Sequence, residues 1–147
     1  MPLNVGEGLL RETFATLRSC GAGKAECVAY WSGPLDHSGV VDALHHPDHR
    51  ASPFYYEIDD HWLTRVWIEL AQRRRAIRAQ VHTHAGPAFH SRLDDDFPIV
   101  ATPGFLSLVL PRFALGEPTL DEAYLAELDE VGQWHELDPR KSLKVSP

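Results

Sequence analysis

Several features that assign a chain to a particular class are missing from this sequence. It has no run of about 18 apolar residues, so we expect no membrane-spanning helix. Its first residues, MPLNVGEGLLRETF, lack the basic flank and apolar block of a secretory signal. Two cysteines, Cys20 and Cys27, are too few for a disulfide framework and for a thiolate zinc site. We therefore expect a cytoplasmic protein with reduced cysteines and no membrane partner.

An excess of basic charge is also missing. The formal net charge is −7, which would repel the phosphates of a nucleic acid, so we expect no such partner. The one basic cluster, QRRR with Arg78 just beyond it, is typical of a helix end, where cations complement the helix dipole. Internal repeats, low-complexity tracts and linkers are absent, and we expect residues 1–147 to form a single domain.

Hydrophobic spacing predicts strands interleaved with two helices. Leu10, Phe14 and Leu17 form one apolar helical face, and CGAG ends that helix. A second helix is expected over 57–75, with Trp62 and Trp67 in the core. Strands are expected over 25–33, 39–46, 76–84 and 105–111, with a hairpin over 123–137 and a Pro-rich loop over 45–54. The first two strands should pair through the turn between them. These elements predict an α/β or α+β domain around one mixed sheet.

The stretch HTHAGPAFHSRLDDD, residues 82–96, concentrates residue types that bind metals. Side chains on a strand alternate between its faces, so His82 and His84 should project to the same side. Two histidines and one carboxylate form an established catalytic zinc set, which leaves a fourth position for water. Open iron sites use the same ligand types, but on all-β scaffolds that this chain does not resemble. A His-x-His pair alone is more often a solvated polar segment, and the SRLD run that follows favours the metal site.

The pattern H-T-H, six residues, S-R-L-D resembles the signature of the JAMM/MPN metalloproteases in their short bacterial form, often called Prok-JAB. In that family a glutamate on an early strand precedes H-[S/T]-H and S-x-x-D. Glu26, in AECVAYWSG, is the natural counterpart of that glutamate. The order of expected elements also follows the family's layout over about residues 5–112. The resemblance implies an MPN/JAB-like domain with a mixed central sheet flanked by helices, a cytidine-deaminase-like architecture.

Carried over to this sequence, the resemblance implies one catalytic Zn²⁺ per chain, held by His82, His84 and Asp94. Glu26 would be the general base that activates water and later protonates the departing amine. Ser91 would donate a hydrogen bond to the oxyanion of the tetrahedral intermediate.

Some assignments have alternatives. Counting from Ser91 selects Asp94 as the third ligand, whereas counting from His84 selects Asp95; we favour Asp94. Glu57 is a second candidate base should Glu26 face away. The histidines of HHPDH, His45, His46 and His49, could bind a metal adventitiously. Cys27 should point to the strand face opposite Glu26 as a small buried residue.

The function implied by the resemblance is that of a zinc-dependent isopeptidase, like a deubiquitinase. It would cleave a ubiquitin-like protein from conjugates or trim its C-terminus. The run DDDFPIVATPGFLSLVLPRFA is most similar to members encoded beside activating and conjugating enzymes, some of which act against phage. One alternative is a non-catalytic MPN scaffold, which the complete motif opposes. Another is a JAB peptidase that processes a sulfur-carrier protein or a small peptide conjugate.

Overall fold

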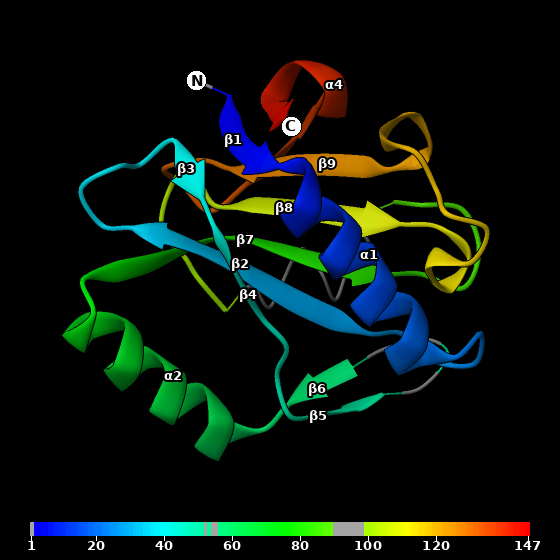
Figure 1. Cartoon of the computed structure of the whole chain (residues 1–147), viewed down its shortest axis with the longest axis horizontal. Helices are drawn as coiled ribbons and strands as arrows, with labels where there is room; N and C mark the ends of the chain where they lie inside the picture. Colours follow the sequence, from blue (N-terminus) through cyan, green and yellow to red (C-terminus); the bar gives the residue numbers. More distant parts are fainter. Residues whose placement is uncertain (1, 52, 54–55, 90–98) are drawn as a thin grey trace.

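The centre of the protein is a six-stranded sheet in the order β10-β9-β8-β7-β2-β4 (Figure 1). The computed structural model describes residues 2–51, 53, 56–89 and 99–147. The strands of this sheet are β2 (Val28–Pro34), β4 (Ala43–His45), β7 (Arg75–Thr83), β8 (Leu106–Leu110), β9 (Tyr124–Leu128) and β10 (Trp134–Leu137). β7 and β8 are parallel, and the other neighbouring pairs are antiparallel, so the sheet is mixed as expected.

Two smaller sheets complete the described strands. β1 (Leu3–Gly6) lies between β3 (Val40–Val41) and β11 (Leu143–Ser146) and runs parallel to both. β5 (His49–Ala51) pairs with β6 (Tyr56–Ile58) in an antiparallel ribbon. β1 and β11 thus bring residues from the two ends of the numbering side by side.

The two long helices begin and end where their local sequence favours it. α1 (Glu7–Gly21) ends at Ala22, which has a φ of 50° and donates its N–H to the Arg18 carbonyl. α2 (Asp60–Gln72) begins after Asp59, whose carboxylate accepts the Trp62 N–H. The helix expected over 57–75 is shorter than predicted, because no basic residue lies in the last turn of α2 and Arg75 already begins β7. Short helical segments occur at Arg112–Ala114 (η1), Leu120–Glu122 (η2) and Pro139–Ser142 (α4).

Both faces of the central sheet are buried, because each packs against one of the long helices. Alternate residues of β2 separate into two clusters. Ala29 and Trp31 pack with Leu17 of α1, which crosses in front of the sheet in Figure 1. Their neighbours Val28 and Tyr30 pack with Val66 and Leu70 of α2. A strand covered on both faces is apolar almost throughout, and every residue of β2 except Pro34 is buried.

Residues 45–54 are not wholly loop, contrary to the sequence-based expectation. His45 belongs to β4, and β5 begins at His49. Pro47 and Pro53 lie outside the strands, so the paired residues keep their N–H donors. The strand expected over 39–46 is also divided, because β3 joins β1 while β4 joins β2. The pairing of this segment with β2 was predicted correctly.

Trp67 does not belong to the core, contrary to expectation. The inward face of α2 is set by residues four apart, Trp62, Val66 and Leu70. Trp62 is partly buried and stacks on Tyr30 with ring centroids 6.2 Å apart. Trp67 lies about 100° further round the helix from Val66, and 38% of it is exposed.

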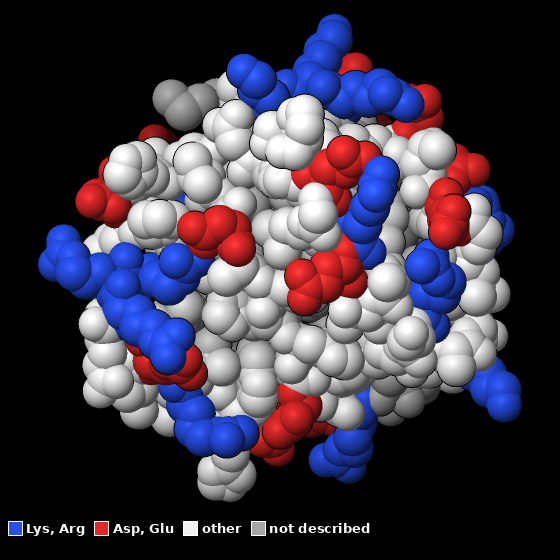
Figure 2. All heavy atoms as spheres, in the orientation of Figure 1, with Lys and Arg blue, Asp and Glu red and all other residues white. Residues whose placement is uncertain are grey.

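The surface carries both signs of charge. On the face drawn in Figure 2, lysine and arginine side chains are interspersed with aspartate and glutamate. Among the helices of the described residues, none has the length and apolar composition needed to cross a membrane.

Candidate metal centre

Two buried histidines lie together at the carboxyl end of β7. His82 is on the strand and His84 follows it by one residue, and their exposed fractions are 0% and 5%. Their ring centroids are 5.2 Å apart, as expected for two side chains on one face of a strand. The strand is held on both sides, because His82 is in register with Val28 of β2 and Val109 of β8. The His84 N–H donates to the Leu110 carbonyl at 2.9 Å, which fixes the backbone past the strand end.

Glu26 is brought to the same place by the chain entering β2. It is 6% exposed, and its Oε1 lies 3.8 Å from Nε2 of His84. The adjacent residue is locked to the histidine segment by two hydrogen bonds. The Cys27 N–H donates to Oγ1 of Thr83, and the Thr83 N–H donates to the Cys27 carbonyl, each at 3.0 Å. Thr83 stands between the two histidines, so the position of Glu26 is tied directly to theirs.

The two imidazoles of this cluster suit a zinc ion, because a neutral imidazole nitrogen is a ligand that zinc uses in proteins. Aromatic rings flank the two histidines. The ring centroids of Tyr56 and His82 are 5.6 Å apart, and those of Phe89 and His84 are 4.7 Å apart.

The remaining residues assigned from the sequence motif are of two kinds, those outside the described residues and the alternative base Glu57. Ser91 and Asp94, together with the alternative ligand Asp95, lie outside the described residues. Glu57, the alternative base, is exposed on β6, whereas Glu26 is buried beside His84. The structure therefore brings together Glu26, His82 and His84.

A second group of potential ligands is formed by Cys20, Cys27, His46 and His49. Cys20 and Cys27 are joined in a disulfide, with their Cα atoms 6.2 Å apart, so the expectation that both are reduced was wrong for this structure. The glycine-containing turn after α1 reverses the chain and brings the two cysteines together. Cys27 is buried with the α1-side residues, and Val28, in register with His82, packs on the α2 side; the predicted opposite-face orientation of Cys27 is confirmed.

Sequence reasoning missed this second group, because it treated the cysteines and the HHPDH histidines separately. The spacing of the two cysteines and that of the two histidines each indicated a possible ligand pair. The cysteines flank the predicted turn between a helix and a strand, and His46 and His49 flank Pro47 and Asp48 in the next connection.

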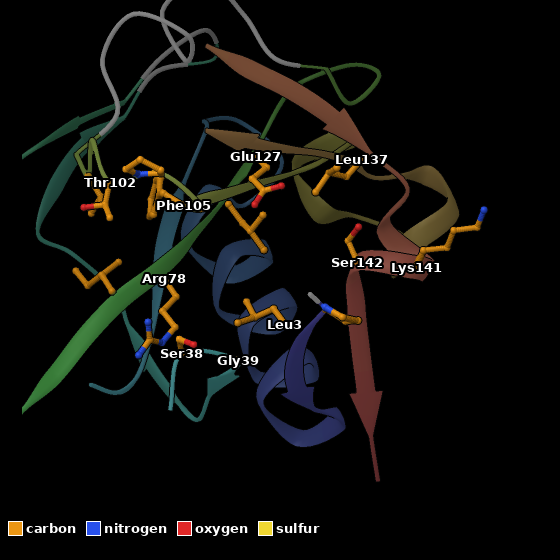
Figure 3. A pocket seen from close by; sticks show the side chains of 16 residues that line it. Leu3, Ser38, Gly39, Arg78, Thr102, Phe105, Glu127, Leu137, Lys141 and Ser142 are labelled. Carbon is orange, nitrogen blue, oxygen red and sulfur yellow. The ribbon is translucent and has the colours of Figure 1, made fainter. Parts of the chain in front are cut away.

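Figure 3 shows a cavity of about 440 Å³ that no residue of either group lines. Arg78, Phe105 and Lys141 are among its lining residues, and Glu26, His82 and His84 are not. Burial lowers the pKa of the Arg78 guanidinium from its ordinary value. One of its terminal nitrogens donates to the Pro34 carbonyl at 2.5 Å. This cavity is therefore not the mouth of the histidine cluster.

Comparison with known proteins gives a relative of stated activity. The chain is 35% identical over 130 residues to "Probable metalloprotease y4jG" of Sinorhizobium fredii, a match that covers 84% of this chain and 79% of the relative. No family model matches the chain.

Solved structures share the fold at low sequence identity. A protein from Desulfitobacterium hafniense has a TM-score of 0.72 at 14% identity and covers 98% of this chain and 92% of its own. A protein from Salinibacter ruber has a TM-score of 0.62 at 19% identity, with coverages of 99% and 91%. A JAB1/MPN domain protein from Archaeoglobus fulgidus has a TM-score of 0.54 at 14% identity, with coverages of 99% and 98%. The mixed sheet flanked by helices is thus the fold of a JAB1/MPN domain.

Proposed function

This chain belongs to the JAMM/MPN family of metalloproteases, and from that premise we propose that it is a zinc-dependent isopeptidase. Its substrate would be a ubiquitin-like protein, either joined to a lysine of a target or carrying a C-terminal extension. The observation that supports catalysis best is the burial of Glu26 and His84 side by side, 3.8 Å apart, next to His82.

His82, His84 and Asp94 would hold the zinc ion. When bound, zinc would act as a Lewis acid that polarises the scissile carbonyl and lowers the pKa of a bound water molecule to about 7. Glu26 would accept the proton of the attacking water on a carboxylate oxygen and return it to the departing amine. Such general acid–base catalysis contributes roughly 10²–10⁴ in rate. Ser91 would donate a hydrogen bond to the developing oxyanion.

The extended C-terminal tail of a ubiquitin-like protein suits such a site. A glycine-rich tail can approach the catalytic residues closely, because glycine has no Cβ, and an extended segment can add to a sheet as an extra strand. We place the protein in the cytoplasm, beside activating and conjugating enzymes encoded with it, in a system that acts against phage. The buried Glu26, His82 and His84 favour an enzyme over a non-catalytic scaffold.

Cleavage of the cognate ubiquitin-like protein, extended at its C-terminus, tests the proposal. The Glu26→Gln variant keeps the shape of the side chain but cannot take a proton, so its kcat should fall by about 10²–10⁴. Its zinc content should equal that of the wild-type protein, because Glu26 is assigned no ligand role. Glu57→Gln is the matched control: this glutamate is exposed, and its substitution should leave kcat unchanged.

Two outcomes contradict the proposal. If Glu26→Gln cleaves as fast as wild type, Glu26 is not the base. If His82→Ala retains both the metal and the activity, the metal centre is wrongly assigned. Parallel reactions on a sulfur-carrier protein and on small peptide conjugates distinguish the substrate classes, since only the true class should be cleaved.

A further inference from the structure

The cluster of Cys20, Cys27, His46 and His49 gathers four ligand atoms from three separate parts of the chain. Cys20 is near the end of α1, and Cys27 immediately precedes β2. His46 follows β4, and His49 is the first residue of β5. Each residue offers one sulfur or ring nitrogen, and these atoms all lie within 4.8 Å of one another. Two thiolates and two imidazoles are one of the standard donor sets of structural zinc.

The distances between sulfur and nitrogen match a tetrahedral site. Around a zinc ion with Zn–S of about 2.3 Å and Zn–N of about 2.0–2.1 Å, a sulfur and a nitrogen are about 3.5 Å apart. Here Sγ of Cys27 lies 3.2 Å from Nε2 of His46 and 3.6 Å from Nε2 of His49. Sγ of Cys20 lies 3.4 Å from Nε2 of His49. The two rings do not stack, since their planes are inclined at 61° with centroids 5.4 Å apart.

The protonation of His49 is also suited to a metal. Its Nδ1 lies 2.9 Å from the Pro47 carbonyl, so Nδ1 must carry the proton that it donates. Nε2 then has a free lone pair, and this is the atom directed at both sulfurs. A backbone carbonyl bound to the second ring nitrogen is a typical outer partner of a metal-binding histidine.

A disulfide alone does not account for this arrangement. A cystine needs no imidazole partners, and its sulfurs are weak acceptors with little to gain from two converging ring nitrogens. Thiolates, in contrast, are strong ligands, and a reducing compartment keeps such cysteine pairs as thiols. The two sulfurs can form either a disulfide or a pair of thiolate ligands, but only the metal-bound state gives the two histidines a role.

We propose that Cys20, Cys27, His46 and His49, once the disulfide is reduced, bind one Zn²⁺ in a structural site separate from the catalytic cluster. Reduction needs a dithiol or phosphine. A phosphine gives up two electrons, takes the oxygen of a water molecule, and the two protons of that water go to the sulfurs as the S–S bond breaks. Zinc binding then releases both thiol protons to solvent as the two Zn–S bonds form.

The site would hold Glu26 in register with the histidines of the catalytic cluster. It would link the end of α1, the start of β2 and the β4–β5 connection across a small region. Cys27 is the residue next to Glu26, and its backbone is hydrogen-bonded in both directions to Thr83. A metal ligand at Cys27 would therefore fix the peptide that carries Glu26.

Cobalt titration tests the site without reference to protease activity. The full chain is reduced with a phosphine, freed of metal with a chelator and titrated with Co²⁺. We expect a thiolate-to-cobalt charge-transfer band that grows until the thiolate site is filled and disappears when Zn²⁺, the tighter-binding ion, is added. His82 and His84 cannot produce this band, because they contribute no sulfur. The result is thus independent of the proposed function.

Three variants locate the ligands. Cys20→Ser combined with Cys27→Ser should abolish the band. His46→Ala, at an exposed position where loss of folding is not expected, should weaken Co²⁺ binding by more than about 100-fold. His37→Ala, another exposed histidine, is the matched control and should bind as wild type does.

Two results would overturn the site. The first is a reduced wild-type chain whose thiols react with a thiol reagent but give no band with Co²⁺. The second is a band of unchanged strength and affinity in His46→Ala, which would show that the thiols bind the ion without this histidine.

Discussion

Thr83 offers a direct test of how the catalytic cluster is held together. Its hydroxyl accepts the Cys27 N–H at 3.0 Å, and both residues are 0% exposed. Replacing Thr83 with Val keeps the β-branched shape that suits a strand but leaves that N–H buried without its acceptor. An unsatisfied buried donor costs about 1–3 kcal/mol. With a urea m-value of about 2 kcal/mol/M, the unfolding midpoint should fall by about 0.5–1.5 M.

Thr83→Ser is the matched control, because it keeps the hydroxyl and loses only a methyl group, at about 0.5–1.5 kcal/mol. Hydrogen exchange separates the two effects. The Cys27 amide should exchange faster in Thr83→Val than in Thr83→Ser, relative to the amides of β8. Activity should follow, because a displacement of about 1 Å in a catalytic group can lower the rate 10²-fold. If the Cys27 amide stays equally protected in both variants, the hydrogen bond does not hold this segment.

Two further predictions concern folding. Gly33→Ala would place a methyl group against the Val40 carbonyl oxygen and should destabilise the protein by about 1–3 kcal/mol in urea unfolding. Gly8→Ala is the control: open space surrounds Gly8, so this change should be neutral or stabilising by up to about 1 kcal/mol. Equal effects of the two substitutions would contradict this packing. Hydrogen bonds from the Gln133 N–H and, second, from His135 lower the pKa of the Asp129 carboxyl group. The carboxylate therefore stabilises the folded state above the unfolded-state pKa, and this stabilisation is lost as pH falls through the folded-state pKa. Asp129→Ala should therefore be less stable than wild type at pH 7, with a deficit that closes in acid; a deficit independent of pH would show that the carboxylate charge is not responsible.

The parts of the fold that sequence predicted well are those where one physical signal dominates. α2 has an N-terminal carboxylate cap and an apolar stripe through Val66 and Leu70. β7 is a strand that carries His82, and His84, one residue past its end, lies beside His82 as alternation predicts. The hairpin of β9 and β10 was likewise predicted from alternation and a turn. Glu26 was found through a resemblance, and its proximity to His84 agrees with that assignment.

The parts that sequence did not predict depend on contacts between distant segments. β1 and β11 are only four residues each, and their parallel pairing joins positions that no local pattern connects. The β5–β6 ribbon was obscured by the prolines on either side of β5. The cysteine and histidine cluster draws on the end of α1, the residue before β2, and the residues after β4 and at the start of β5. Spacing in the sequence marks each pair separately, and only the folded chain shows that the two pairs meet.

The pairing of β1 with β11 has a consequence for synthesis on the ribosome. Leu3 is in register with Leu143, which is made much later than Leu3, and both side chains are buried. One edge of β1 therefore stays without its partner strand until β11 has been made. A nascent chain stalled shortly before that point would display an unpaired strand edge, which is where chaperones or neighbouring chains would engage it.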